Sequence, residues 1–162
     1  MQPATLCYLL RPDDEEVLLI RKKRGLGEGL YVGPGGKVED GETPRECVVR
    51  EVEEEIGVTP RDPEKVGEFR FVFGNDPRMF VHVFRAEAFA GTPAESPEAD
   101  PEWFDYDAVP YDEMWEDDRY WLPHLFAGET FAGEFVFDAE GDELLEWDVE
   151  TGVRDVDAVA EF

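Results

Sequence analysis

Residues 36–58 read GKVEDGETPRECVVREVEEEIGV, and this stretch decides how we expect the chain to fold. Thr43-Pro44-Arg45-Glu46 has the pattern of a capping box with proline at the first helical position. Gly57 supplies a stop, because glycine adopts the left-handed conformation that ends many helices. At helical spacing, one apolar stripe is formed by Val48, Val49, Val52 and Ile56. The stretch therefore predicts a helix that begins after Thr43, runs through Ile56 and packs on a core.

Three glutamates lie together on the face of this helix beside the apolar stripe: Glu51, Glu54 and Glu55. Like charges at such spacing destabilise a helix, and only Arg50 is near enough to compensate them. Hard divalent cations such as Mg²⁺ prefer oxygen ligands and share their coordination shell with substrate phosphates. The glutamates therefore indicate either a metal site or a solvated acidic face.

The spacing around the helix favours the metal site. Gly36 is followed after five residues by Glu42 and, after seven more, by the run 50–58, which reads REVEEEIGV. This arrangement fills every fixed position of the Nudix box and resembles it closely. The box requires a Gly, a Glu, an Arg-Glu pair, an aliphatic residue, a Glu-Glu pair, a Gly and a final aliphatic residue.

Segments outside the box are similar to the MutT-type branch of Nudix hydrolases that acts on oxidised purine nucleoside triphosphates. They are residues 22–25, 35–38, 81–84, 91–96 and 114–121, and the likeness runs from about Thr5 to Val149. The resemblance implies an α+β Nudix fold, with a mixed β-sheet sandwiched between helices. It also implies an Mg²⁺-dependent pyrophosphohydrolase that sanitises the nucleotide pool. Such an enzyme converts substrates such as 8-oxo-dGTP to a monophosphate and pyrophosphate.

The same resemblance implies where the metal, Mg²⁺ or Mn²⁺, is held. Its implied ligands are the backbone carbonyl of Gly35 and the carboxylates of Glu51, Glu54, Glu55 and Glu98. Arg50 is implied to orient the box carboxylates through a salt bridge, and Glu42 to support the loop before the helix. For Glu98, which lies in an acidic loop, plain surface charge is the alternative.

For the nucleoside, the resemblance implies that Trp115 stacks on the base and that Asp117 and Asp118 contact its edge. Other residues implied to line the pocket are Thr5, Lys22, Tyr31, Phe71, Phe73 and Met79. The alternatives are a core position for Trp115 and surface charge for the two aspartates.

One departure from the family pattern concerns the base. The family's base-reading asparagine, in the loop before the box, aligns with Val32. An amide donates and accepts hydrogen bonds, whereas valine does neither. This difference puts a strict preference for 8-oxoguanine in doubt but leaves the hydrolytic chemistry intact.

The formal charge of −26 is the main feature of the composition. Because nucleic-acid binding depends on clustered basic residues, this charge argues against a nucleic-acid partner. The partner that the resemblance implies is the small nucleotide substrate. Dense negative charge is screened at high salt, so we hypothesise an organism with a salty cytoplasm. No run approaches the roughly 18 apolar residues that a membrane span needs, and we see no secretory signal, so we expect a cytoplasmic protein. We also expect it to be a monomer. Cys7 and Cys47 are expected to be small buried hydrophobes.

Residues 1–162 are expected to form a single domain with an acidic tail from about residue 151. Alternating patterns predict strands at 5–10 and 17–20, a hairpin of 65–73 with 79–89, and a closing hairpin of 131–137 with 143–149. Residues 91–101 are expected to form a loop and residues 112–126 a helix kinked or ended by Pro123.

Two other functions stay open at this point. A Nudix hydrolase of dinucleoside polyphosphates or nucleotide sugars would keep the box and change the pocket. A Nudix domain that only senses nucleotides would bind without turnover, although such domains usually lose box acids that this chain retains.

Overall fold

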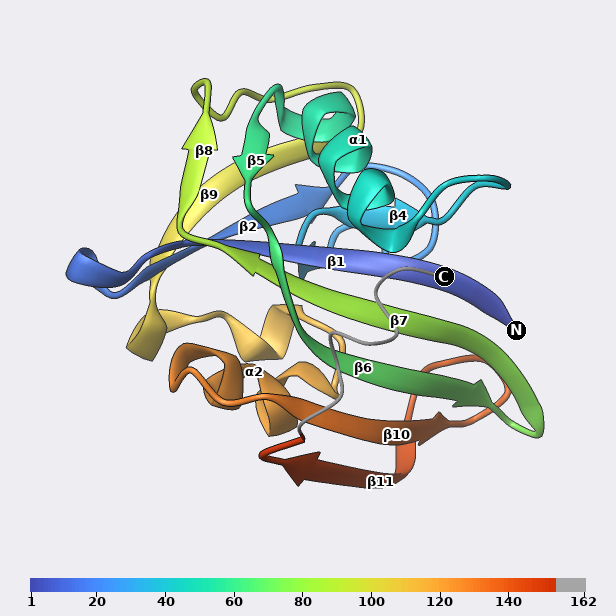
Figure 1. Ribbon diagram of the computed structural model, residues 1–162. Coiled ribbons are helices and arrows are strands. Elements are labelled where there is room, and N and C mark those ends of the chain that lie inside the picture. The colour runs from blue at the N-terminus through green and yellow to red at the C-terminus, as the bar shows by residue number, and fades with distance from the viewer. Residues whose placement is uncertain (154–162) are drawn as a thin grey trace.

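The computed structural model describes residues 1–153, in which strand β1 (Gln2–Arg11) joins two hydrophobic cores. Alternate residues of a strand point to opposite faces of a sheet. Cys7 and Leu9 of β1 therefore pack with Val48, Val52 and Ile56 of helix α1 (Pro44–Ile56). Tyr8 and Leu10 pack on the other face with Trp121, Leu122 and Leu125 of helix α2 (Asp118–Phe126). The mixed sheet thus lies between the two helices, as the sequence predicts (Figure 1).

Within the described residues, nine strands form this sheet, and its main path has the order β11-β10-β6-β7-β1-β2-β3. The remaining strands of this path are β2 (Glu16–Lys22), β3 (Tyr31–Val32), β6 (Glu64–Phe73), β7 (Asp76–Ala86), β10 (Phe131–Phe137) and β11 (Leu144–Thr151). β4 (Gly35–Lys37) pairs with β1, and β9 (Ala99–Asp105) pairs with β2. β1 runs parallel to β7, and β6 runs parallel to β10, whereas the hairpin partners are antiparallel. A separate two-stranded sheet joins β5 (Thr59–Arg61) to β8 (Ala88–Ala90).

Helix α1 begins and ends as its sequence predicts. The Thr43 hydroxyl accepts from the Glu46 amide at 3.1 Å, and the Glu46 carboxylate accepts from the Thr43 amide at 2.9 Å. Gly57 ends the helix at φ 73°, in the left-handed region that a side chain disfavours. The expected stripe is wrong at Val49, which is only half-buried, because it turns away from β1 toward the outer groove beside Arg45 and Glu53.

Aromatic rings dominate the core beneath α2. Phe69 stacks on Phe131 with ring centroids 5.3 Å apart and lies 5.0 Å from Trp121. Phe135 approaches Phe69 edge-on at 5.1 Å. Because these rings come from β6, β10 and α2, their burial fixes the helix against the closing half of the sheet.

Two predicted segments differ from the structure. Residues 91–101 are not all loop, because β9 starts at Ala99 and pairs with β2 along seven residues. The predicted helix 112–126 is shorter, since Met114 is extended and α2 begins only at Asp118. Pro123 lies inside α2 without ending it. The acidic tail lies largely outside the described residues, because β11 continues to Thr151.

The remaining features agree with the sequence prediction. Cys7 and Cys47 are both free and buried. The two predicted hairpins form, but the bounds of the second strand of the first hairpin differ from 79–89. β7 runs from Asp76 to Ala86, and Phe89 lies in β8, which pairs with β5. Among residues 1–153, no helix is both long enough and apolar enough to cross a membrane.

The charge of this fold predicts that its stability depends on salt. The sequence carries 41 acidic residues against 15 Lys and Arg, and of the acids in the described chain only Glu55, Asp117 and Asp118 are buried. The repulsion among the remaining, solvent-accessible acids weakens as the screening length falls to about 3 Å at 1 M salt. We therefore expect the melting temperature to rise steeply from low salt to 2 M KCl. Equal melting temperatures at the two salt concentrations, measured by circular dichroism, would contradict this expectation.

Candidate functional site

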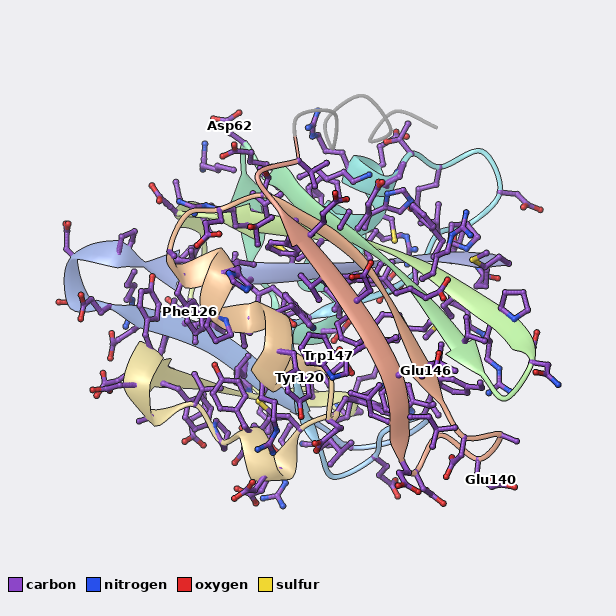
Figure 2. All side chains as sticks on the ribbon, turned by 90° about the horizontal axis from the view of Figure 1, so that it is seen from below. Asp62, Tyr120, Phe126, Glu140, Glu146 and Trp147 are labelled. Carbon is purple, nitrogen blue, oxygen red and sulfur yellow. The ribbon has the colours of Figure 1, made fainter. Side chains whose placement is uncertain are left out.

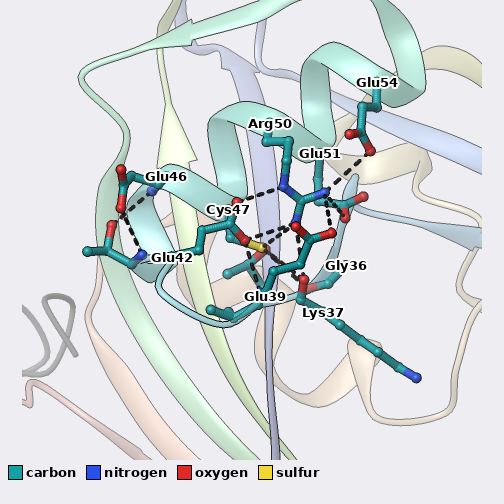
Figure 3. Close-up of polar contacts among 12 residues, drawn as sticks. Gly36, Lys37, Glu39, Glu42, Glu46, Cys47, Arg50, Glu51 and Glu54 are labelled. Carbon is teal, nitrogen blue, oxygen red and sulfur yellow. Dashed lines mark hydrogen bonds and ion pairs between the residues drawn. The ribbon is translucent and has the colours of Figure 1, made fainter.

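Arg50 ties the loop before α1 to the acidic face of the helix (Figure 3). Its Nε and Nη2 donate to the two oxygens of Glu42 at 2.6 and 2.9 Å, and Nη2 also donates to the Lys37 carbonyl at 3.2 Å. Nη1 donates to Glu51 at 2.8 Å and lies 3.4 Å from Glu54. The bidentate pair lowers the pKa of Glu42 to about 2, so Glu42 stays ionised and the loop stays fixed.

Glu55 is buried and Glu51, one turn before it on α1, is partly buried, so their carboxylates form a pair beside this loop. The Gly35 amide donates to Glu55 at 3.2 Å. A Cβ at residue 36 would lie 2.6 Å from the Glu51 carboxyl carbon, so only glycine allows this approach. Burial and the neighbouring Glu51 raise the pKa of Glu55 to about 8, and burial also raises the pKa of Glu51. Two carboxylates in so little water are suited to a cation between or beside them.

This donor set matches a hard divalent metal. The available atoms are carboxylate oxygens and the Gly35 carbonyl, which Mg²⁺ prefers. Glu98 lines the same cavity as Glu51 and Glu55, but its carboxylate accepts from Arg24 at 2.9 Å. Glu54 does not line the cavity, and 53% of its side chain is exposed. Within residues 1–153, no three Asp, Glu, His or Cys side chains already stand in a ligating arrangement.

A cavity of about 410 Å³ connects these carboxylates to the predicted nucleoside pocket. This volume is in the range of small-molecule sites. The predicted pocket residues that line it are Thr5, Lys22, Phe71, Phe73, Met79, Trp115, Asp117 and Asp118. The structure therefore brings the α1 acids and the predicted base contacts to one cavity, although Glu55 and Trp115 are 60 residues apart in sequence.

Asp117 and Asp118 form a second buried acid pair at the start of α2. The indole Nε1 of Trp121 donates to Asp117 Oδ2 at 2.9 Å. Burial raises the pKa of Asp117 to about 6, and burial together with Asp117 raises the pKa of Asp118 well above its ordinary value. Because close carboxylates resist double ionisation, the pair can hold a proton at neutral pH and present both a donor and an acceptor.

Trp115 supplies the aromatic face of the cavity. Its ring is half-buried and packs 6.4 Å from Phe73 and 5.8 Å from Phe137. Gly27 faces the indole, and a Cβ there would lie 3.0 Å from its Nε1. The indole is thus supported from behind by the sheet and from the loop, while it still lines the cavity.

Tyr31 is placed differently from the prediction. It does not line the cavity; its ring lies edge-on 5.2 Å from Phe104, with Arg21 over it at 5.4 Å. Tyr31 and Val32 are neighbours in β3, so their side chains point to opposite faces. Val32 is the one that lines the cavity, and Tyr31 therefore turns away.

Sequence reasoning missed several lining residues: Tyr8, Arg24, Leu26, Gly33 and Phe137. Tyr8 and Phe137 look like ordinary strand residues, since only the sheet order brings β1 and β10 near the segment 115–118. Arg24 adds a positive charge to the wall of the cavity.

Known proteins are similar to this chain in sequence and in fold. The sequence matches the NUDIX domain family over residues 1–125. It is 41% identical over 155 residues to an oxidized purine nucleoside triphosphate hydrolase of Mus musculus, covering 95% of each chain. It is 44% identical over 134 residues to the protein of that name from Danio rerio, covering 82% of this chain and 85% of the other.

A solved structure agrees with these relatives. The crystal structure of a mutator MutT protein from Bacillus halodurans superimposes with a TM-score of 0.81 at 31% identity, covering 93% of this chain and 98% of that one. The box on α1, the mixed sheet between two helices and these similarities confirm the predicted family: the chain belongs to the Nudix hydrolases.

Proposed function

We propose that this protein hydrolyses oxidised purine nucleoside triphosphates to the monophosphate and pyrophosphate. The observation that carries the proposal is the single cavity lined by the Glu51–Glu55 pair and by Trp115 with Asp117 and Asp118. One part suits a metal-bound polyphosphate and the other a flat base with polar edges. The relatives at 41% and 44% identity, both named for this substrate class, support the same choice.

Mg²⁺, with Mn²⁺ as a substitute, is the proposed cofactor. The residues that would hold it are Gly35 through its carbonyl and Glu51, Glu54, Glu55 and Glu98 through their carboxylates. When bound, such an ion neutralises developing phosphate charge and lowers the pKa of water. Arg50 fixes the Glu51 carboxylate at 2.8 Å, while Lys22 and Arg24 line the cavity and offset the acidic field toward the polyphosphate.

For the base, Trp115 provides a stacking surface and the Asp117–Asp118 pair provides hydrogen bonds to the purine edge. Trp121 donates to Asp117, and the raised pKa values of the pair let one of its two carboxyls keep a proton. Thr5, Phe71, Phe73 and Met79 complete the wall. Val32 adds no polar contact, so we propose a purine pocket that discriminates less strictly than one with asparagine at that position.

We further propose that residues 1–162 act as one catalytic domain, and that the protein is a cytoplasmic monomer adapted to high salt. The charge of −26 supports the monomer, because like-charged copies repel each other at low salt. It also supports adaptation to high salt, because salt screens the repulsion within the chain.

Metal dependence tests the acidic site. We expect activity on 8-oxo-dGTP to vanish with EDTA and to return with Mg²⁺ or Mn²⁺. Mutation of a group that only orients a metal ligand typically lowers metal affinity or activity by about 10–100-fold. Glu54→Gln and Glu55→Gln, which change the proposed ligands themselves, should therefore each lower kcat at least about a hundredfold. The matched control is Glu53→Gln on the exposed face of the same helix.

Steady-state kinetics on folded variants separate the outcomes. Near-normal turnover by Glu55→Gln would show that the proposed metal site on α1 is wrong. Normal turnover by Glu54→Gln alone would remove Glu54 from the ligand set and leave the site in place.

Base selectivity tests the pocket. We expect 8-oxo-dGTP to be preferred over dGTP, and Val32→Asn to widen that preference, because the amide adds a polar contact that discriminates by about 1–3 kcal/mol. Asp117→Ala should lose the preference. The measurement is kcat/KM for both nucleotides and for dCTP; equal hydrolysis of dCTP and 8-oxo-dGTP would contradict the pocket.

The raised pKa values of the aspartate pair predict a pH effect on stability. A carboxyl whose folded pKa is raised stabilises the fold at low pH, and this contribution is lost as pH rises through the folded pKa. For Asp117 the loss begins above its ordinary pKa of 3.8 and passes through about 6. Asp118→Asn should therefore raise the melting temperature at pH 8 and change it little at pH 4. An equal shift at both pH values would show that the pair is not protonated in the fold.

A further inference from the structure

Tyr8 is a polar residue of the cavity that neither the box nor the base-contact residues account for. It lies in the middle of β1, is only 1% exposed and lines the cavity. A Cβ at residue 33 would lie 2.7 Å from the Tyr8 Cζ, so the chain passes directly over the phenol only because Gly33 has no side chain. The Gly33 backbone is also close enough to the phenol oxygen to lower its pKa, although burial outweighs this effect. The hydroxyl is thus adjacent to Val32, at the segment where the family places its amide.

On its other side, Tyr8 faces the residues expected to read the base. Its ring meets Trp121 edge-on at 5.6 Å, and Trp121 is the residue that donates to Asp117. Burial first, and then the charges of Asp118 and Asp117, raise the pKa of the Tyr8 phenol well above its ordinary value. The phenol therefore keeps its proton at any physiological pH.

The hydrogen-bonding capacity of this hydroxyl fits a purine. A phenol has one proton to donate and two lone pairs. Val32, Phe71, Phe73 and Met79, which share this cavity, offer no such group.

We propose that Tyr8 is a specificity-determining residue, whose hydroxyl hydrogen-bonds the purine edge in place of the amide that Val32 cannot supply. The inference rests on the proposed function and names one more contact of the same pocket. It also explains how a chain with valine at position 32 keeps a second polar group for the base beside the aspartate pair.

The test is equilibrium binding of 8-oxo-dGMP and dCMP, measured by calorimetry at high salt. Tyr8→Phe removes only the hydroxyl and keeps the ring against Trp121, so its melting temperature should stay close to that of the wild type. We expect its Kd for 8-oxo-dGMP to rise about five- to tenfold, the effect of one hydrogen bond, while its Kd for dCMP stays unchanged. Tyr8→Phe with Val32→Asn should recover most of the loss, because the amide then supplies the contact.

A matched control is Tyr120→Phe, which loses the same atom outside the cavity. Tyr120 stacks on Trp147 of β11 at 4.4 Å on the outer side of α2 (Figure 2). Its removal should leave both dissociation constants unchanged.

Two results would overturn the inference alone. In the first, the wild-type protein prefers 8-oxo-dGMP and the Tyr8→Phe variant prefers it equally. In the second, the Tyr8→Phe variant loses affinity for 8-oxo-dGMP and dCMP to the same extent. The second result would mean that Tyr8 only shapes the cavity. A wild-type protein without any preference for 8-oxo-dGMP over dCMP would overturn the proposed function and the inference together.

Discussion

The close approach of a glycine loop to the carboxylates of Glu51 and Glu55 is the constraint on which this structure depends. Glu51 and Glu55 lie where water is scarce and like charge is near, an arrangement that a helix alone would not favour. Arg50 offsets part of this repulsion and also binds Glu42, so the same guanidinium orders the loop and orients the acid. The capping box then fixes where α1 starts, and with it the position of every carboxylate along the helix.

The sheet connects the acidic face of α1 with the proposed base contacts near α2. β1 presents Cys7 and Leu9 to α1, and Tyr8 and Leu10 to the core beneath α2. Because one strand serves both cores, the acids of α1 and the aspartates at the start of α2 are held by a common support. Hydrolysis and base recognition can therefore change independently in sequence while their relative position stays fixed by β1.

Much of this arrangement could be predicted from the sequence, and the exceptions have physical reasons. Helix α1 is specified by local signals, namely the cap at Thr43, the stop at Gly57 and the apolar stripe, so its ends are correct. The strand at Ala99–Asp105 was missed because its pairing partner, β2, is about 80 residues away in sequence and its own composition is rich in acids and proline. Tyr31 was misplaced because a strand of two residues is too short for its sequence to show which side chain faces the cavity. Tyr8 was missed since its position in the cavity follows from sheet order, which only the fold reveals. The ligand set around Glu54 and Glu98 stays a prediction.

The ion pairs that link the segment 23–24 to the loop 95–98 have a kinetic consequence. Lys23 contacts Glu95, and Arg24, which lines the cavity, contacts Glu98 at 2.9 Å, so part of the positive charge near the cavity is already neutralised by the protein's own acids. A triphosphate approaching a chain of charge −26 is repelled over distances that shrink as salt is added. For most enzymes with charged substrates, salt slows encounter by screening attraction. Here added salt screens a repulsion, so the association rate of the anionic substrate should rise with salt concentration. The ions of the solvent would then help the substrate to reach the cavity.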